Sequence, residues 1–163
     1  KGTGTVRNIT IRGNILIGNE DPHQPFPNAP QGLGFFDGPL VNFLIEKNVV
    51  YTTHYHGISL YAPENCQILD NVVKGIDQSS NRKPWILLST KKKGGAKGNT
   101  VKNNMASSFN LKADPNVIAE NNVPVNDAVF ATRMQEQEEF INKKFGAFHP
   151  VAKLSRGGMK KGS

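Results

Sequence analysis

The chain has 163 residues, of which 37% are hydrophobic, and its formal net charge is +7 at pH 7. That length favours one domain, and no apolar run approaches the roughly 20 residues of a membrane helix. The single cysteine, Cys66, excludes an internal disulfide, and the opening residues lack the pattern of a signal peptide.

A pair of asparagines recurs along the chain. The stretches that begin and end with Asn are 8–14, 42–48, 65–71 and 116–122, and a shorter one spans 99–104. An apolar residue follows the second Asn of the longer stretches: Ile15, Val49, Val72 and Val123. Self-similarity at a period of roughly 20 to 35 residues predicts stacked coils. Asn tolerates the left-handed backbone conformation of a bend, and stacked Asn side chains can form an amide ladder.

Short strands are expected within, before and after each Asn pair. Between the two Asn, alternate residues are apolar, as at Ile9 and Ile11, and this alternation predicts a strand with one buried face. The strands expected before the pairs are 32–36, 57–61, 85–89 and 110–113. Those expected after the second Asn are 15–17, 49–51, 72–73 and 105–106.

Three short strands per turn predict an all-β fold, a right-handed parallel β-helix of about five coils spaced about 4.8 Å apart, over residues 1–125. At this level residues 6–125 resemble the pectate-lyase-like superfamily, which includes polysaccharide lyases, hydrolases and phage tailspikes. A β-sandwich does not explain the Asn spacing, and the dense leucines of leucine-rich repeats are missing. Nothing before Asn8 has the pattern of a capping helix. The chain is therefore expected to be the C-terminal piece of a longer protein, or its open end to be covered by a partner subunit.

The apolar spacing changes at residue 126, and residues 126–146 predict an amphipathic helix. Asn126 or Asp127 can cap its start, and Gly146 can end it. The apolar residues at helical spacing, which are also the candidate partner-docking residues, are Phe130, Met134, Ile141 and Phe145. We expect this helix to cap the C-terminal end of the β-helix, with docking on another subunit as the alternative.

Residues 147–163 predict an extended basic tail that is too polar and Gly-rich to fold alone. Its basic docking candidates are Lys153, Arg156, Lys160 and Lys161. With the basic loop 91–97, they can attract nucleic acid, acidic glycans or an acidic protein surface. Neither segment has the interleaved aromatics of a single-strand binding groove, so we expect a protein partner rather than nucleic acid.

One corner of the expected coils collects extra residues, at 20–31, 52–56 and 76–84. Loops on a rigid scaffold concentrate binding residues. The candidate glycan contacts there are His23, His54, Tyr55, His56, Asp77, Arg82 and Trp85. In an extended segment His54 and His56 would share one side, about 6.6 Å apart, and could meet a metal with His23. Corner histidines beside Tyr55 need no metal, and we expect neither a metal nor a cofactor.

The sequence offers little for catalysis. A glycosidase needs two carboxylates about 5 to 9 Å apart. Glu46 and Asp70 are expected at similar places in successive coils, where outward, solvated positions explain them. Asp37 is interpreted as a turn residue, and Cys66 as a buried, inert thiol. Lyases of the resembling superfamily use calcium-binding aspartates with a basic residue, and no matching cluster occurs. We therefore expect a non-enzymatic protein, with a polysaccharide lyase or glycoside hydrolase as the alternative.

Segments 34–39, 54–61 and 84–86 are similar to the right-handed β-helix repeat proteins of bacteriophages and prophages. That resemblance implies a structural virion component, such as a tailspike, a fibre or a head or neck decoration, with other virion subunits and further copies of itself as partners. The alternative is a glycan-binding or glycan-degrading protein that is secreted or displayed at the cell surface. The resemblance transfers no catalytic residue.

Overall fold

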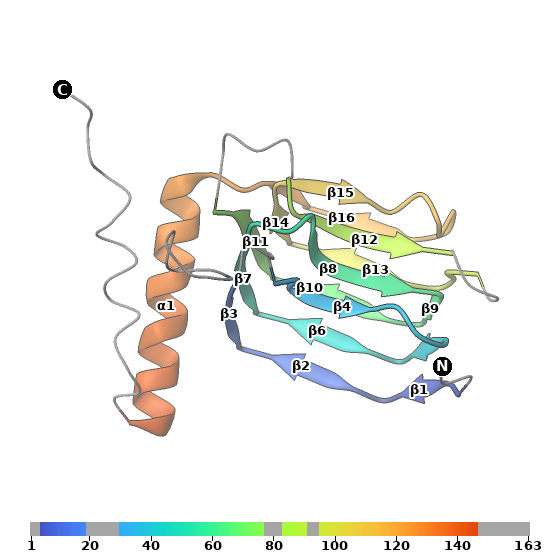
Figure 1. Cartoon of the computed structure of the whole chain (residues 1–163), viewed down its shortest axis with the longest axis horizontal. Coiled ribbons are helices and arrows are strands. Elements are labelled where there is room, and N and C mark those ends of the chain that lie inside the picture. The colour runs from blue at the N-terminus through green and yellow to red at the C-terminus, as the bar shows by residue number, and fades with distance from the viewer. Residues whose placement is uncertain (1–3, 19–29, 77–82, 91–94, 147–163) are drawn as a thin grey trace.

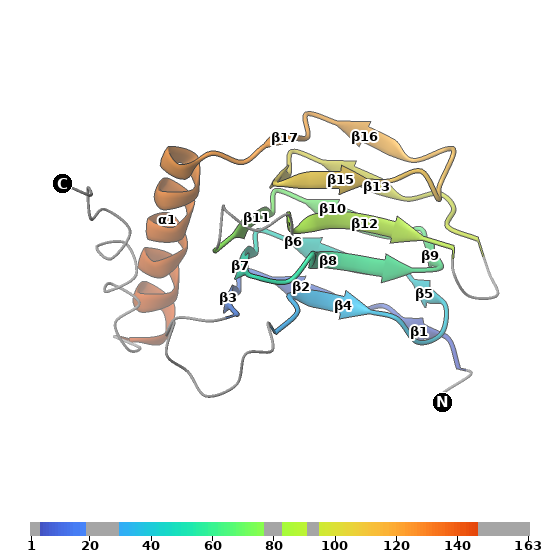
Figure 2. The ribbon, with the colours of Figure 1, turned by 45° about the horizontal axis from the view of Figure 1, so that its top comes forward.

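A computed structural model describes residues 4–18, 30–76, 83–90 and 95–146. Within these ranges the chain forms strands β1 to β17 and then one helix, α1 (Asp127–Phe145). The strands lie side by side in parallel layers, and the helix stands beside them (Figures 1 and 2). The predicted tail, with Lys153, Arg156, Lys160 and Lys161, lies outside the described residues.

The strands divide into four parallel sheets. The three-stranded sheet is β1 (Val6–Arg7), β5 (Leu40–Val41) and β9 (Pro63–Glu64). One five-stranded sheet is β2 (Thr10–Arg12), β6 (Leu44–Glu46), β10 (Gln67–Leu69), β13 (Thr100–Lys102) and β16 (Ile118–Glu120). The other is β3 (Ile15–Ile17), β7 (Val49–Thr52), β11 (Val72–Gly75), β14 (Met105–Ala106) and β17 (Val123–Pro124). The four-stranded sheet is β4 (Leu33–Phe35), β8 (His56–Tyr61), β12 (Trp85–Ser89) and β15 (Ser108–Asn110).

The predicted fold, a right-handed parallel β-helix of about five coils, is wrong. The described strands form four separate parallel sheets of three, five, five and four strands, and these do not amount to a single stack of coils. The sheet of β1, β5 and β9 was not predicted at all. Its strands have two residues each, which is too short for an apolar alternation to show in the sequence. The fold is mostly β, with four short parallel sheets and a C-terminal helix.

The register between repeats and most of the local strand predictions are confirmed, but the strand expected at 110–113 lies at Ser108–Asn110 instead. Ile11 pairs with Ile45, and Ile45 pairs with Ile68. The column continues through Val101 and Ala119. Because side chains alternate between the two faces of a strand, this register puts every member of the column on the same face.

The bends between strands depend on left-handed residues. Asn8, Asn42 and Asn65 each have φ between 52° and 58°. At the second bend the left-handed residue is the one before the recurring Asn, as at Lys47 and Asp70. In these three stretches the first Asn therefore supplies the backbone conformation, whereas Gly98, with a φ of 65°, does so before Asn99. The second Asn has a different role.

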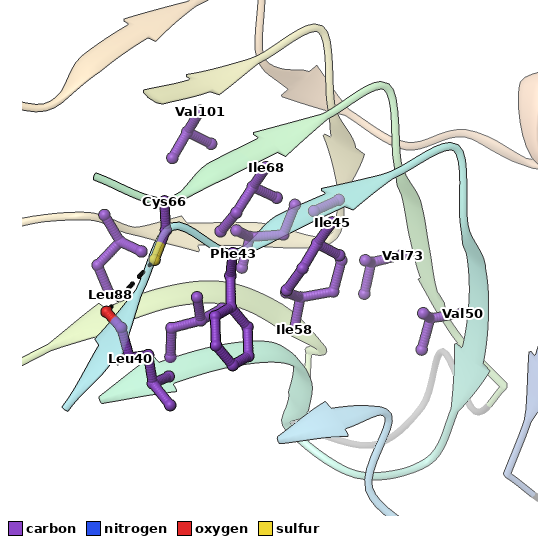
Figure 3. Close-up of a cluster of buried hydrophobic side chains, with 13 residues drawn as sticks. Leu40, Phe43, Ile45, Val50, Ile58, Cys66, Ile68, Val73, Leu88 and Val101 are labelled. Atoms are coloured by element: carbon purple, nitrogen blue, oxygen red, sulfur yellow. Dashed lines mark hydrogen bonds between the residues drawn. The ribbon is translucent and has the colours of Figure 1, made fainter. Parts of the chain in front are cut away.

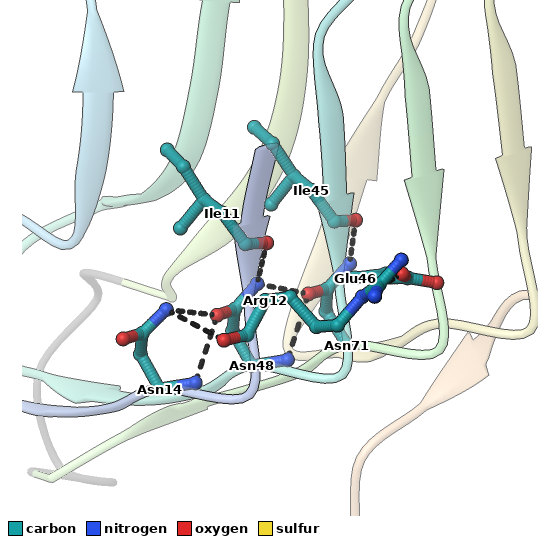
Figure 4. Close-up of polar contacts among 7 residues, drawn as sticks. All are labelled: Ile11, Arg12, Asn14, Ile45, Glu46, Asn48 and Asn71. Carbon is teal, nitrogen blue, oxygen red and sulfur yellow. Dashed lines mark hydrogen bonds and ion pairs between the residues drawn. The ribbon is translucent and has the colours of Figure 1, made fainter. Parts of the chain in front are cut away.

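The second Asn of each pair forms a ladder inside the molecule. Each side-chain amide donates to the side-chain oxygen of the next Asn at 2.9 to 3.0 Å, in the series Asn14, Asn48, Asn71, Asn104 and Asn122. Figure 4 shows its first steps, in which the amide of Asn48 also donates to the main-chain oxygen of Ile11. Asn48, Asn71 and Asn104 are fully buried. Among the described residues no buried side-chain polar atom lacks a hydrogen-bond partner, so the ladder adds order without an unsatisfied group.

The hydrophobic core lies between the sheets (Figure 3). Ile45 and Ile68 point from one sheet toward Ile58 of another, and Phe43 fills the space beside them. The remaining members of the cluster are Leu40, Val50, Leu60, Cys66, Val73, Ile86, Leu88, Val101 and Ala106. The sheets hold one another in place through this shared core rather than through hydrogen bonds between sheets.

The helix begins and ends as predicted. The side chain of Asn126 accepts a hydrogen bond from the main-chain N–H of Val129 at 2.9 Å. Gly146 has a φ of 80° and follows the last helical residue. No helix in the described part of the chain has both the length and the apolar character needed to cross a membrane.

The predicted position of the helix at the C-terminal end is wrong, because α1 lies along the outer side of β3, β7 and β11 (Figures 1 and 2). Phe130 stacks on Tyr51 with 4.9 Å between ring centroids. Lys74 lies over both rings and forms an ion pair with Asp127 at 3.0 Å. Tyr51 and Lys74, which point outward from the sheet, thus hold the helix against the side of that sheet. Met134 is buried and Ile141 is half-buried, while the side chain of Phe145 lies outside the description.

Replacing Phe130 by alanine is expected to detach α1 while leaving the sheets folded. Most of the stability of a helix in a protein comes from the packing of its apolar face, so losing the Tyr51 contact should remove most of the circular dichroism signal of α1 at 222 nm. Phe140→Ala is the matched control, because the Phe140 side chain is 51% exposed. Equal loss of helical signal in both variants would contradict the proposed anchoring role of Phe130.

Candidate binding site at the aromatic corner

Four of the predicted glycan-contact residues meet at one corner, where β7 leads into β8 and β12 begins: His54, Tyr55, His56 and Trp85. The other three, His23, Asp77 and Arg82, lie outside the described residues. The corner cluster is therefore the part of the predicted site that can be described.

A bulge in β8 creates the corner. Trp85 pairs with His56, but the next residue, Ile86, pairs with Ile58, so Gly57 is extra. A Cβ on Gly57 would lie 2.2 Å from Cγ1 of Val73, so no larger residue fits. Such bulges redirect side chains at the end of a strand. Here the bulge accompanies the bend at residues 53–55, within the corner 52–56 that the sequence predicted.

The inner side of the cluster is polar and buried. The indole N–H of Trp85 is shared between Nδ1 of His56 at 3.2 Å and Oγ of Ser59 at 3.3 Å. The same two acceptors lie 2.7 Å from each other. Because an indole nitrogen can only donate, its bond to Nδ1 makes that nitrogen of His56 an acceptor. His56 and Ser59 thus fix the orientation of Trp85 rather than face solvent.

The outer side of the cluster is a set of contacting rings. The ring centroid of Tyr55 lies 4.2 Å from that of His54, 4.4 Å from that of His56 and 5.1 Å from that of Trp85. The rings of His54 and His56 stack with 5.3 Å between their centroids. Tyr55 is 39% exposed. It is held by three rings and still presents surface to solvent, which suits the face of a sugar ring.

Nδ1 of His54 accepts a hydrogen bond from the main-chain N–H of His56 at 3.0 Å. The main-chain N–H of His54 donates to Oγ1 of Thr52, whose hydroxyl donates to the Pro30 carbonyl. These bonds hold the bend at a fixed shape, so the rings are preorganised.

Three further members of the cluster, Phe36, Ser59 and Tyr61, were not among the predicted contacts. Phe36 contacts the rings of His56 and Tyr61 at 4.9 and 5.0 Å, and Ser59 completes the buried hydrogen bonds. Phe36 and Tyr61 belong to neighbouring repeats, so their contact depends on the stacking of β4 on β8. The aromatic runs 34–36 and 54–61 were visible in the sequence, but nothing in them indicated that they would meet.

The expectation that Glu46 and Asp70 occupy similar places in successive repeats is wrong. Glu46 forms an ion pair with Arg12 (Figure 4), and its register partner in the next repeat is Leu69 rather than Asp70. Asp70 occupies the left-handed bend instead, with a φ of 56°. The two carboxylates therefore have different structural roles.

Cys66 lies in the core, where its side chain is 1% exposed. Burial raises the pKa of its thiol, which disfavours the reactive thiolate. This agrees with its interpretation as a structural residue. Among the described residues no group of three His, Cys, Asp or Glu side chains is arranged to hold a metal ion.

A second concave region lies between α1 and the bends of the sheets. It is a groove of about 660 Å³ lined by Arg12, Gly13, Lys47, Asn48, Val49, Asp70, Val72, Arg133, Glu136, Gln137, Phe140 and Lys144. The amide of Gln137 donates to the Gly13 carbonyl at 2.6 Å across one side of it. The charged side chains of the lining are basic at Arg12, Lys47, Arg133 and Lys144 and acidic at Asp70 and Glu136, so the groove carries both signs of charge.

Comparison with known proteins gives no relative on which to base an assignment. No protein-family model matches the chain, and neither does any curated protein or solved structure. Any function therefore has to be argued from the residues and contacts described above.

Proposed function

We propose that this chain is a non-enzymatic structural component of a bacteriophage particle, in the place of a tailspike, a fibre or a head or neck decoration. The particle assignment rests on the similarity of segments 34–39, 54–61 and 84–86 to phage repeat proteins. Its partners would be other virion subunits and further copies of the chain, and its location would be the virion. A secreted or cell-surface location is the alternative.

The buried Asn ladder is the observation that supports a structural role. It links Asn48, Asn71 and Asn104 through side-chain bonds, and each amide also reaches a main-chain oxygen of the preceding repeat, as from Asn71 to Ile45 at 2.9 Å. Hydrogen-bond networks in a buried, low-dielectric setting strengthen one another and hold one arrangement. Neighbouring repeats that are linked in this way resist bending and slippage, which an extended component of a particle has to do.

The direct test is whether the chain travels with particles. Particles from the host that encodes it would be banded on a density gradient, and the fractions probed with an antibody against the chain. We expect the chain to sediment with the major capsid protein and to stay there after a high-salt wash. Recovery in the soluble fractions alone would contradict a structural role.

A second candidate function, glycan binding, is favoured by the aromatic corner. Tyr55 presents an exposed ring face that is held by His54 and Trp85. Aromatic rings fixed in this way are efficient contacts because little side-chain entropy is lost on binding. A structural particle component and a glycan contact are compatible, since fibres and tailspikes meet the host surface.

Replacing Tyr55 by alanine is expected to weaken binding to the host's capsular polysaccharide by about tenfold, the effect typical of a central aromatic contact. Isothermal titration calorimetry with purified polysaccharide would measure it. Tyr55→Phe keeps the ring and should retain most of the affinity. The melting temperatures should stay close to the wild-type value because Tyr55 lies at the surface. Unchanged affinity of the alanine variant would exclude this corner as the glycan site, and release of oligosaccharides would instead favour the enzymatic alternative.

A further inference from the structure

Three of the parallel sheets expose strand edges of matching design at their two ends. At one end, β2, β3 and β4 each pair on one side only, and at the other end β16, β17 and β15 do the same within the described residues (Figures 1 and 2). All pairings between the repeats are parallel. A second copy placed end to end would therefore continue the same parallel pairing, because both ends belong to the same sheets.

The charges at the two ends are opposite and fall in one column. The register aligns Arg12, Glu46, Leu69, Lys102 and Glu120 in successive strands. Within the chain this column already pairs Arg12 with Glu46 and Lys102 with Glu120. In an end-to-end copy, Glu120 of one molecule would lie beside Arg12 of the next, at the strand spacing of about 4.8 Å.

The Asn ladder is complementary in the same sense. Along the ladder, the main-chain N–H of each Asn donates to the side-chain oxygen of the next one, as from Asn104 to Asn122 at 3.1 Å. At one end of the series Oδ1 of Asn14 accepts no hydrogen bond among the described residues. At the other end the main-chain N–H of Asn122 donates none. An end-to-end neighbour would bring that donor to that acceptor and extend the ladder by one step.

Four of the six exposed large hydrophobic residues in the described part of the chain lie at these same ends. Ile118 and Val123 lie in β16 and β17 and are 51% and 44% exposed. Val6 and Ile9 lie in and beside β1 at the opposite end and are 42% and 37% exposed. Strand edges that carry apolar side chains are prone to pair with another chain.

We infer that a second copy of this chain docks end to end, with β16 of one copy pairing with β2 of the next in parallel register. This inference rests on the proposed structural function and names the partner. Main-chain hydrogen bonds supply affinity, and the Arg12–Glu120 pair and the Asn14–Asn122 step fix the register. Pro124 lacks an N–H group and withholds a donor from the β17 edge, so the interface depends on β16 rather than β17.

An end-to-end contact uses a different surface on each copy, so it does not close on itself and produces a series of oligomers. Sedimentation velocity of the purified chain over a range of concentrations is expected to show dimers and longer species that increase together. Arg12→Glu and Glu120→Lys each place like charges at the new contact and should weaken association at least about tenfold.

Mixing the two variants gives the sharper result. The Arg12→Glu copy keeps its β16 edge, and the Glu120→Lys copy keeps its β2 edge. In an equal mixture the two variants can alternate end to end, and every contact then places opposite charges at positions 12 and 120. Mixing should therefore restore association. Arg133→Glu and Glu136→Lys are the matched controls, because they break an exposed ion pair on α1 and should leave association unchanged. Circular dichroism melting confirms that each variant is folded, and Arg12→Gln and Glu120→Gln replace any that is not.

The inference is overturned if the wild-type chain stays monomeric at every soluble concentration, or if the folded edge variants associate like the controls. It is also overturned if the mixture of folded variants stays monomeric. These outcomes are separate from particle incorporation. If a monomer sediments with particles, the proposed function is retained without the end-to-end contact. If the chain forms oligomers but is absent from particles, the end-to-end contact is retained without the proposed function.

Discussion

Replacing Asn71 by alanine is expected to lower the free energy of unfolding by about 3 kcal/mol or more, since each buried group left without a partner costs about 1 to 3 kcal/mol. Oδ1 of Asn71 accepts from the main-chain N–H and the side-chain amide of Asn48, and its own amide donates to Ile45 and Asn104. Alanine leaves several of these groups buried and unpaired. Urea denaturation followed by circular dichroism at 218 nm would measure the loss.

Asn14 provides the control for Asn71, because it occupies the equivalent position at the end of the ladder and is exposed. Water can replace its bonds to Asn48, so Asn14→Ala should cost less than about 1 kcal/mol. If the two variants lose the same stability, the interior of the ladder contributes no more than its end. In that case the support for a rigid structural scaffold would be lost.

Replacing Ile68 by alanine is expected to cost about 2 to 5 kcal/mol, the range for removing a buried aliphatic side chain from a tight core. Ile68 is 1% exposed and stands in the middle of the column formed with Ile45 and Val101. The cavity would lie between sheets that are held together by this core. Thermal and urea unfolding would both report the loss.

Ile118→Ala is the matched control for Ile68→Ala, because the same side chain is removed from an edge strand where it is 51% exposed. Its cost should stay within about 0.5 kcal/mol. Similar losses at Ile68 and Ile118 would show that the core is not organised around the central column.

Part of the corner site could be predicted from sequence. His54, Tyr55 and His56 are neighbours in the chain, and Trp85 begins the strand of the next repeat, so a repeat pattern is enough to bring them together. Phe36, Ser59 and Tyr61 were missed because their contacts depend on the bulge at Gly57 and on how β4 stacks on β8. Neither leaves a periodic signal.

The sequence by itself determined the local rules of this chain. Asn8, Asn42 and Asn65 specify left-handed bends because Asn tolerates that backbone region. Apolar alternation specifies which face of each strand is buried, and a shift of one residue would expose that whole face. Those two constraints fix the register of Ile11, Ile45 and Ile68 and the Asn ladder, since both act within a few residues of the chain.

Only the tertiary structure decided how these pieces are arranged. The division into four sheets depends on two-residue strands such as β1 and β5, whose pairing comes from neighbours rather than from their own pattern. The apolar stripe of α1 required a partner without specifying which. Tyr51 and Lys74, outward residues of two different strands, contact Phe130 and Asp127 and so place the helix against the outer side of the sheet. Packing between segments distant in sequence chooses among arrangements that satisfy the same local pattern, and for that reason the sequence alone did not specify it.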